Sequence, residues 1–283
     1  MAIVITSNVP SLIAQNHLSE TSRVLNKSIA KLASGKRIVS AEDDPAGLAI
    51  SNRFESAARS LLVAQRNSND GLSMLQVAEG GLQEIGSILV RMRELTIQAA
   101  NGTLSNSDRS FLNTELIELK NEIARISTST KYNGNNILDG TYSTIGLEIQ
   151  VGISGSTSDR MTINIISATT SALGSVGELT ISQLTISESA GHAKTMIKYL
   201  DAAIDDISLT RSNIGAKLSR LNSTIRSISV SYMNLVGANS RILDVDVAEE
   251  TSQIMRSQIL VQAGVSVLSQ ANSAPQIALG LLG

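Results

Sequence analysis

The sequence predicts a mainly α-helical protein, an elongated antiparallel helical bundle or coiled coil with a small β-hairpin insertion. Three observations indicate this fold class: aliphatic residues repeat at helical spacing over long stretches, aromatic residues make up only 2% of the chain, and Trp is absent. A core of aliphatic side chains favours thin helix bundles over a thick globular core. The 283 residues are enough for one large domain or two modest ones.

The strongest helical pattern lies in the C-terminal third of the chain. From Ala193 to Ile242, apolar residues recur at alternating spacings of four and three, interrupted only by the polar residues Arg211 and Asn239. This pattern is typical of a coiled-coil seam, and its rare polar positions can fix the register of paired helices. A helix of about 50 residues would be roughly 75 Å long.

Three shorter seams in the first half of the chain offer partners for this helix. Each repeats mainly apolar residues at similar spacings. We therefore expect the long helix to return along helices from the N-terminal half. The seams are Leu18, Ser22, Leu25, Ile29 and Leu32; Leu82, Ile85, Leu89, Met92, Thr96 and Ala99; and Leu112, Leu116, Leu119, Ile123 and Ile126.

Capping residues mark the helix boundaries. Asp44 followed by Pro45 predicts a helix start, with Asp44 as the N-cap and Pro45 in the first turn, where its missing N–H costs nothing. Asn101 and Gly102 predict the end of one helix, and "SNSD" at 105–108 predicts the cap of the next.

The expected β structure lies at about 141–175. "GLEIQVG" at 146–152 and "RMTINIIS" at 160–167 alternate apolar and polar residues and are rich in β-branched side chains. Gly, Ser and Asn bound both segments. This pattern predicts two short strands that form a hairpin.

Both ends of the chain lack charged side chains. No formal charge follows Arg256, and none of Asp, Glu, Lys or Arg precedes Glu20. Amides and hydroxyls interrupt the C-terminal tail too often for a membrane span, which needs about 20 predominantly apolar residues. Such groups can be buried when they find hydrogen-bond partners. The ends therefore predict helices that are buried against protein, with no membrane partner.

The composition predicts no catalytic, cofactor or metal site. The chain has no Cys, and its two His residues, His17 and His192, leave little for a metal site or a Cys/His nucleophile. "DVDVAEE" at 244–250 lacks the glycine turn of a calcium loop, and helix capping explains it better. The net charge of −2 and the dispersed basic residues predict no nucleic-acid partner. No Lys or Arg precedes Arg23, so we expect no cleaved secretory signal.

Two long motifs make the chain resemble bacterial flagellin. "LASGKRIVSAEDDPAGLAISNRF" at 32–54 is similar to the N-terminal flagellin signature. "SRILDVDVAEETSQIMRSQILVQAGVSVLSQANSAPQIALGLLG" at 240–283 is similar to the C-terminal signature. "VRMRELTIQAANGT" and "KYNGNNILDG" match as well. The resemblance covers nearly everything except about 150–195.

The resemblance implies a structural subunit that polymerises into the extracellular flagellar filament for swimming motility. It implies a terminal coiled coil, D0, formed by 1–44 and 244–283, and a helical rod, D1, formed by 45–190 and 191–243. The outer domains of longer flagellins are expected to be absent. The residues expected in the filament core are Leu25, Ile29, Leu32, Ile254, Leu260, Val267 and Leu268.

The same resemblance implies several partners. They are further copies of the chain, an export chaperone at the C-terminal tail, and hook-associated and cap proteins, with type III export and no cleaved signal peptide. It also implies that an innate Toll-like receptor recognises a patch of Arg91, Leu95 and Glu115, in which Arg91 and Leu95 share one helix face. The alternatives are a hook–filament junction protein, which shares the terminal coiled coil, and a non-flagellar coiled-coil scaffold.

Overall fold

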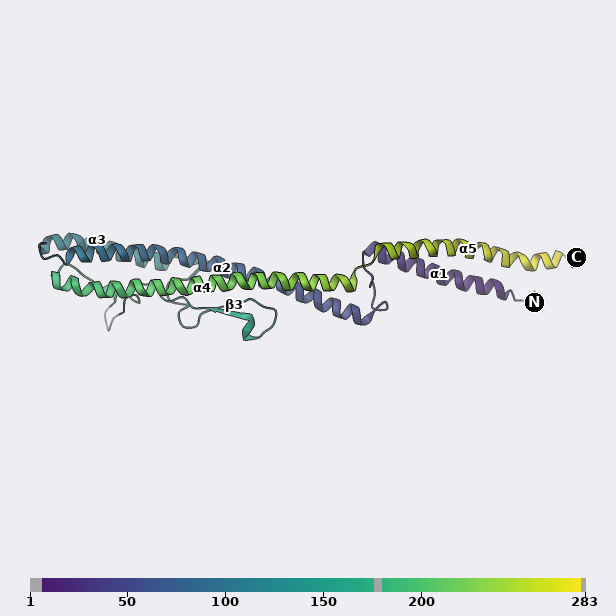
Figure 1. Cartoon of the computed structure of the whole chain (residues 1–283), viewed down its shortest axis with the longest axis horizontal. Coiled ribbons are helices and arrows are strands. Elements are labelled where there is room, and N and C mark those ends of the chain that lie inside the picture. Colours follow the sequence, from purple (N-terminus) through teal and green to yellow (C-terminus); the bar gives the residue numbers. More distant parts are fainter. Residues whose placement is uncertain (1–6, 176–179, 281–283) are drawn as a thin grey trace. The chain divides into compact units, whose positions relative to one another are not determined.

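The protein is mainly α-helical, as predicted. The computed structural model describes residues 7–175 and 180–280, with side chains up to residue 273. The chain forms two compact units, Met1–Ala58 with Met233–Gly283, and Arg59–Tyr232. The helices, in chain order, are α1 (Val9–Ser34), α2 (Pro45–Ala99), α3 (Asn106–Ser129), α4 (Ala190–Leu243) and α5 (Val247–Gly280) (Figure 1).

The unit Arg59–Tyr232 is built on an antiparallel bundle of α2, α3 and α4. Arg93 on α2 pairs with Asp201 on α4, and Arg91 on α2 pairs with Glu115 on α3. The predicted α2 seam is the centre of the core. Its members have no exposed surface in the structure: Leu82, Ile85, Leu89, Met92, Thr96 and Ala99.

The long seam predicted for the C-terminal third is confirmed on α4. Every seventh residue from Ala193 to Ile228 is at most 5% exposed. The residues between them are half-buried at the edges of the contact, including Ile197, Ile204 and Ile225. The polar seam residue Arg211 forms an ion pair with Glu79 of α2, which is consistent with a role in fixing register.

The predicted helix caps are also confirmed. Asp44 Oδ1 accepts a hydrogen bond from Gly47 N at 2.9 Å, and Pro45 is the first residue of α2. At α3, the Ser105 side chain accepts from Asp108 N, and the Asp108 side chain accepts from Ser105 N. This reciprocal capping box satisfies two backbone donors at the start of the helix.

Two short antiparallel strand pairs precede α4. Strands β3 (Leu147–Gln150) and β4 (Arg160–Ile163) pair as predicted, with Leu147 opposite Ile163. A second pair, β1 (Lys131–Tyr132) and β2 (Asn135–Asn136), was not predicted. Strands of two residues are too short to show alternation. Their signal was the Asn133-Gly134 turn, in which both residues have positive φ, as tight hairpin turns require.

The strands β3 and β4 pack against the bundle. A Cβ at Gly71 of α2 would collide with Ile149, so the absence of a side chain lets β3 approach the helix closely. Asn67 Nδ2 donates to Gln150 O at 3.2 Å, and Lys217 Nζ on α4 donates to Thr162 O at 3.0 Å. The strand pair is therefore held against both α2 and α4.

An irregular segment, which includes the 3₁₀ helix Ile181–Gln183, completes the core of this unit. Ile181, Leu184 and Ile186 are at most 1% exposed. Lys120 Nζ on α3 donates to the carbonyl oxygens of Ser182 and Leu184, and burial lowers the pKa of this lysine. The segment therefore covers the bundle while α3 satisfies its backbone carbonyls.

In the other unit, two short connections link the terminal helices α1 and α5 to α2 and α4. Residues 35–44 join α1 to α2, and residues 244–246 join α4 to α5. Lys36 and Asp244 form an antiparallel bridge, and Val245 N donates to Gly35 O at 3.1 Å. The connections are therefore tied to each other by backbone hydrogen bonds.

Asp43 anchors the connection between α1 and α2. Its carboxylate accepts hydrogen bonds from Val39 N and Ser40 N, each at 3.0 Å, and pairs with Lys27 Nζ at 2.5 Å. The side chain of Asp43 is only 8% exposed. The hydrogen bond from Lys27, followed by that from Val39, lowers the pKa of this carboxyl.

Candidate self-assembly surfaces

The two terminal helices, α1 and α5, lie side by side and antiparallel (Figure 1). Near the start of α1, Asn8 Nδ2 donates to Ala271 O at 2.9 Å, and Ser11 Oγ donates to Asn272 Oδ1 at 2.7 Å. Asn8 Oδ1 also accepts from Ser11 N as the helix N-cap. Polar side chains therefore set the register of this pair at its far end from the connections.

Small residues bring α1 and α5 close together. Ser11, Ser28 and Ser257 are at most 5% exposed in the seam between the helices. A Cβ at Gly264 would come within 3.3 Å of Leu18, which leaves little room for a larger residue. The half-buried aliphatic residues of the seam are Leu18, Leu25, Leu32, Ile254, Val261 and Leu268.

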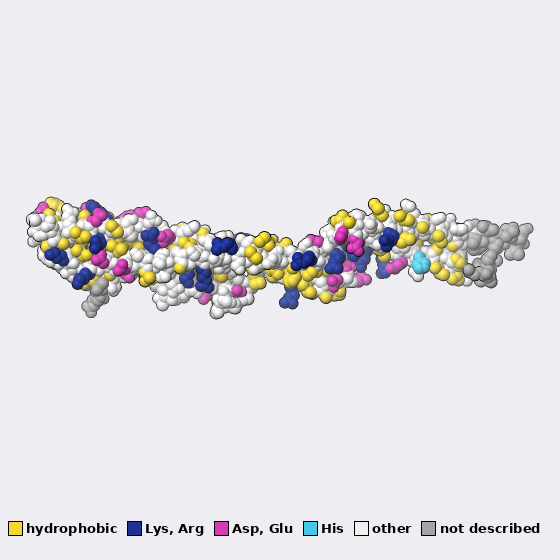
Figure 2. All heavy atoms as spheres, in the orientation of Figure 1, with side chains coloured by type: hydrophobic (Ala, Val, Ile, Leu, Met, Phe, Trp, Pro, Cys, Tyr) yellow, Lys and Arg dark blue, Asp and Glu magenta, His cyan; other side chains and the backbone are white. Residues whose placement is uncertain are grey.

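Large aliphatic side chains of the same two helices face outward (Figure 2). Ile259 is 66% exposed, Met255 is 65% exposed and Leu12 is 60% exposed. Several large apolar side chains exposed on the same pair of helices indicate a protein interaction site. The other large apolar residues exposed on these helices are Val9, Ile13, Ile29, Val247, Leu260, Val265 and Val267.

The residues expected in the filament core divide between the seam and the outward face. Ile29 is 46% exposed, and the buried residue at that level of the α1 seam is Ser28. The apolar side chain suggested Ile29, but Ser28 has the heptad spacing, three residues after Leu25 and four before Leu32. The seam contains Leu25, Leu32, Ile254 and Leu268, and the outward face contains Ile29, Leu260 and Val267.

A second surface lies on α2 and α3, where the receptor patch was expected. Arg91 Nη2 is 2.8 Å from Glu115 Oε1, and Arg91 Nη1 is 3.1 Å from Glu94 Oε2. The hydrogen bonds to Glu115 and Glu94 raise the pKa of Arg91. Leu95 is only 1% exposed and belongs to the core of the bundle. The exposed part of the expected patch is therefore the ion pair.

Arg109, which no predicted site includes, fixes the turn between α2 and α3. The side chain is 6% exposed. Its guanidinium donates to Ala99 O at 2.9 Å, to Asn101 O at 3.0 Å and to Asn106 Oδ1 at 2.9 Å. It thereby satisfies carbonyls at the C-terminus of α2. The sequence signal for this role was a basic residue directly after the predicted turn between two helices.

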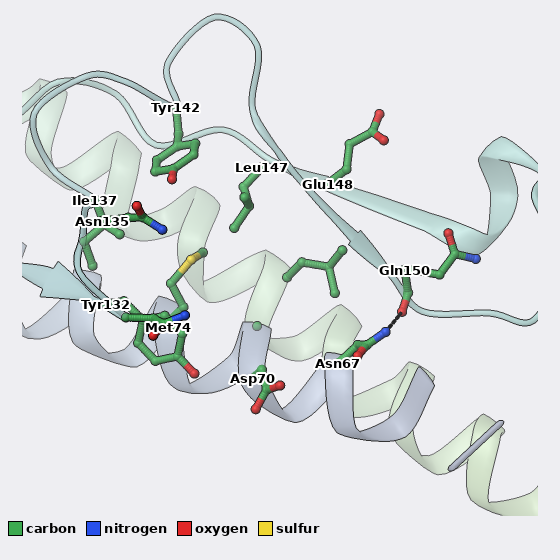
Figure 3. A pocket seen from close by; sticks show the side chains of 13 residues that line it. Asn67, Asp70, Met74, Tyr132, Asn135, Ile137, Tyr142, Leu147, Glu148 and Gln150 are labelled. Atoms are coloured by element: carbon green, nitrogen blue, oxygen red, sulfur yellow. Dashed lines mark hydrogen bonds between the residues drawn. The ribbon is translucent and has the colours of Figure 1, made fainter. Parts of the chain in front are cut away.

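A cavity of about 430 Å³ lies between α2, the β1–β2 hairpin and β3 (Figure 3). Met74, Leu147 and Tyr142 point toward one another across it, whereas Glu148 and Asp70 point away. No Lys or Arg lines it. Its lining combines aliphatic and aromatic side chains with the amides of Asn67, Asn135 and Gln150. Without a basic group, such a lining suits an uncharged or aromatic side chain better than an anion.

The described residues contain neither a metal-binding cluster nor a membrane-spanning helix. Within residues 7–175 and 180–280, no three His, Cys, Asp or Glu side chains lie close enough together to form a metal site. None of the helices in these ranges combines the length and apolar character that a membrane span needs.

Long helices with paired, apolar ends define a class of self-assembling structural proteins, and comparison with known proteins gives the family. Residues 5–143 match the bacterial flagellin N-terminal helical region, and residues 197–282 match the bacterial flagellin C-terminal helical region. The chain belongs to the bacterial flagellin family. Flagellins are structural proteins and not enzymes.

Relatives named flagellin align over the whole chain. Flagellin FlaB2 of Treponema pallidum is 38% identical over 288 residues, covering 99% of this chain and 100% of the relative. The flagellin of Bacillus subtilis is 38% identical over 303 residues, covering 98% and 99%. Among solved structures, Bacillus cereus flagellin is 37% identical and covers 58% of this chain and 88% of its own, with a TM-score of 0.49.

Proposed function

We propose that this chain is the structural subunit of a bacterial flagellar filament, and that it polymerises with copies of itself. The observation that carries the proposal is the outward apolar face of α1 and α5 in a member of the flagellin family. This face needs neighbours to remove it from water, and burial of apolar surface is favourable by about 25 cal/mol per Å². In a heterologous contact, one surface of a subunit binds a different surface of the next copy. Repeated contacts of this kind build an open helical polymer when the rotation from one subunit to the next does not close into a ring.

The experiment is polymerisation of purified protein seeded with filament fragments, observed by electron microscopy. The full chain is expected to form long filaments. A variant that lacks residues 257–283 is expected to remain a helical monomer, because the core of Arg59–Tyr232 is made by α2, α3, α4 and the strands. Normal filaments from the truncated variant would contradict the proposal.

We also propose the division into D0 and D1 that the family resemblance implies. D0 would contain 1–44 and 244–283, with its boundaries at the connections beside α1 and α5. The compact units instead divide within α2 and α4. Limited proteolysis tests the proposal, since a D0 that is loose in the monomer is cleaved near 44 and 243, leaving a resistant D1.

Export is proposed to occur through the flagellar type III apparatus without cleavage, to an extracellular filament. A chaperone that binds the apolar C-terminal tail would shield the outward face of α5 before assembly. Hook-associated and cap proteins would contact the subunits at the two ends of the filament. Mass spectrometry of filament subunits tests the first point. Loss of about 20 N-terminal residues, as a cleaved signal requires, would contradict it.

Recognition by an innate Toll-like receptor is proposed for the surface at Arg91 and Glu115. The exposed ion pair presents Arg91 on the surface, and Arg is one of the residue types enriched in the hot spots of protein interfaces. Leu95 would act from beneath by positioning α2, because it is buried. No finding favours the two alternatives, a hook–filament junction protein and a non-flagellar scaffold.

A further inference from the structure

Phe111 on α3 is an aromatic side chain that the subunit leaves uncovered. It is 73% exposed, whereas the other Phe and the four Tyr of the chain are half-buried. An aromatic ring carries a large apolar area, and such rings dominate the energetics of interfaces when they fill pockets. Burial of this ring against a neighbouring surface would therefore be strongly favourable.

The charges beside Phe111 are already paired within the chain. Asp108 accepts hydrogen bonds from Ser105, and Glu115 pairs with Arg91. Burying a charge is costly unless it is paired and hydrogen-bonded. A partner that covers Phe111 therefore leaves neither of these charges newly unpaired.

Part of the lining of the cavity between α2 and β3 is aromatic and aliphatic and can contact this side chain. Met74, which is 3% exposed, lies at the floor of the space, and the half-buried Tyr132 and Tyr142 add aromatic rings to its lining (Figure 3). Sulfur–aromatic and aromatic–aromatic contacts are both favourable, in addition to the burial of apolar area. The free edge of β3 is occupied at Gln150 by Asn67, which disfavours an added peptide strand there.

Phe111 cannot reach the cavity of its own chain. The ion pair aligns Glu115 with Arg91, so Phe111 lies near the level of Leu95 on α2. The cavity lies along α2 at 67–74. More than 20 helical residues separate these levels, which is roughly 30 Å at 1.5 Å per residue. Only a second copy of the chain can bring the ring to the cavity.

We propose that Phe111 of one subunit fills the cavity between α2 and β3 of a neighbouring subunit. This inference rests on the proposed polymerisation. The ring and the cavity are different places on one chain, so the contact is heterologous and leaves a free ring at one end and a free cavity at the other. Each added subunit repeats the contact, which is the geometry that a filament requires.

Cysteine cross-linking tests the contact directly, because the chain has no Cys. Ser110→Cys places a thiol beside Phe111, and Asn135→Cys places one at the rim of the cavity; both positions are exposed. Filaments of the double variant, treated with a short bis-maleimide, are expected to yield a ladder of dimers, trimers and longer products. Each single variant serves as a control without a ladder. A double variant whose filaments give no ladder overturns the proposal.

Phe111→Ala provides the second measurement. It should raise the critical concentration for polymerisation at least about tenfold, while the melting temperature of the monomer stays unchanged because the ring is exposed. Leu209→Ala is the matched control, since Leu209 is 64% exposed on α4. Normal polymerisation of Phe111→Ala overturns this contact and leaves the filament function standing. Failure of the wild type to polymerise removes both.

Discussion

Arg211 of α4 and Glu79 of α2, which are 132 residues apart in the sequence, form an ion pair across the bundle. Both the Nε and the Nη2 atoms of Arg211 lie 2.8 Å from Glu79 Oε1. The side chains are 40% and 29% exposed, and Glu79 Oε2 is buried without a hydrogen-bond partner. The pair therefore joins the two helices in one register at a site that water reaches only in part.

Arg211→Ala should lower the free energy of unfolding by about 1 kcal/mol. Charge-assisted hydrogen bonds contribute about 1.5 to 3 kcal/mol when buried, and exposed pairs contribute about 0 to 1 kcal/mol, so a half-exposed pair lies between. Denaturant unfolding followed by circular dichroism measures the change. Adding Glu79→Gln to Arg211→Ala should recover part of the loss. A neutral Arg211→Ala would show that packing alone sets the register.

Leu221→Asp should destabilise the bundle by about 4 kcal/mol, because an unpaired charge enters a site with no exposed surface. Ile225→Asp should cost less, about 2 kcal/mol, because Ile225 is half-buried at the edge of the seam. Val230→Asp, at a 52% exposed position of the same helix, is the control and should change stability by less than about 0.5 kcal/mol. Thermal melts that rank these variants differently would show that the α4 register is wrong.

Ile259→Asp should abolish polymerisation without changing the thermal melt of the monomer. Ile259 is 66% exposed, so its replacement disturbs little packing within the subunit, but a charge on the outward face opposes burial against a neighbour. Ile259→Leu keeps the face apolar and should polymerise normally. Seeded growth measured by light scattering distinguishes them. Filaments from Ile259→Asp would place this face in water.

Asp43 should make the connection between α1 and α2 sensitive to acid. Its folded-state pKa is lowered from the unfolded value of about 3.9, so its stabilisation is complete above that value. The contribution is lost as pH falls from about 4 toward the folded pKa, since the protonated group no longer pairs with Lys27. Asp43→Asn should destabilise by about 1 to 2 kcal/mol at pH 7. The difference from wild type should shrink in unfolding measured at progressively lower pH, and a constant difference would contradict this assignment.

Arg91→Ala should reduce activation of the innate receptor by monomeric protein. The substitution removes a guanidinium that is exposed and held by Glu115 and Glu94. Arg125→Ala is the control, because Arg125 forms a comparable exposed pair with Glu122 on α3. Reporter cells that express the receptor provide the measurement. Equal potency of Arg91→Ala and wild type, or no response to wild type, would exclude recognition at this patch.

The sequence by itself determined the helices, several of their ends and the family. The seam from Ala193 to Ile242 showed one face of α4 because apolar residues recur there with only two polar interruptions, whereas exposed apolar residues such as Leu209 and Val230 are scattered over the other faces. Asp44, Pro45 and the "SNSD" box predicted helix starts because capping is local chemistry between neighbours in sequence. Alternation of apolar and polar residues over 146–152 and 160–167 predicted β3 and β4, because successive side chains of a strand point to opposite faces.

Tertiary structure decided which apolar residues face inward at the chargeless ends. These segments carry apolar side chains on several faces, so periodicity alone could not choose between Ser28 and Ile29 or exclude Leu260 from the α5 seam. Leu95 is buried and Arg109 caps α2 because of contacts between α2 and α3 that no spacing within one helix reveals. The cavity beside Met74 depends on how closely Gly71 lets β3 approach, and that distance is set only when the strand packs on the helix.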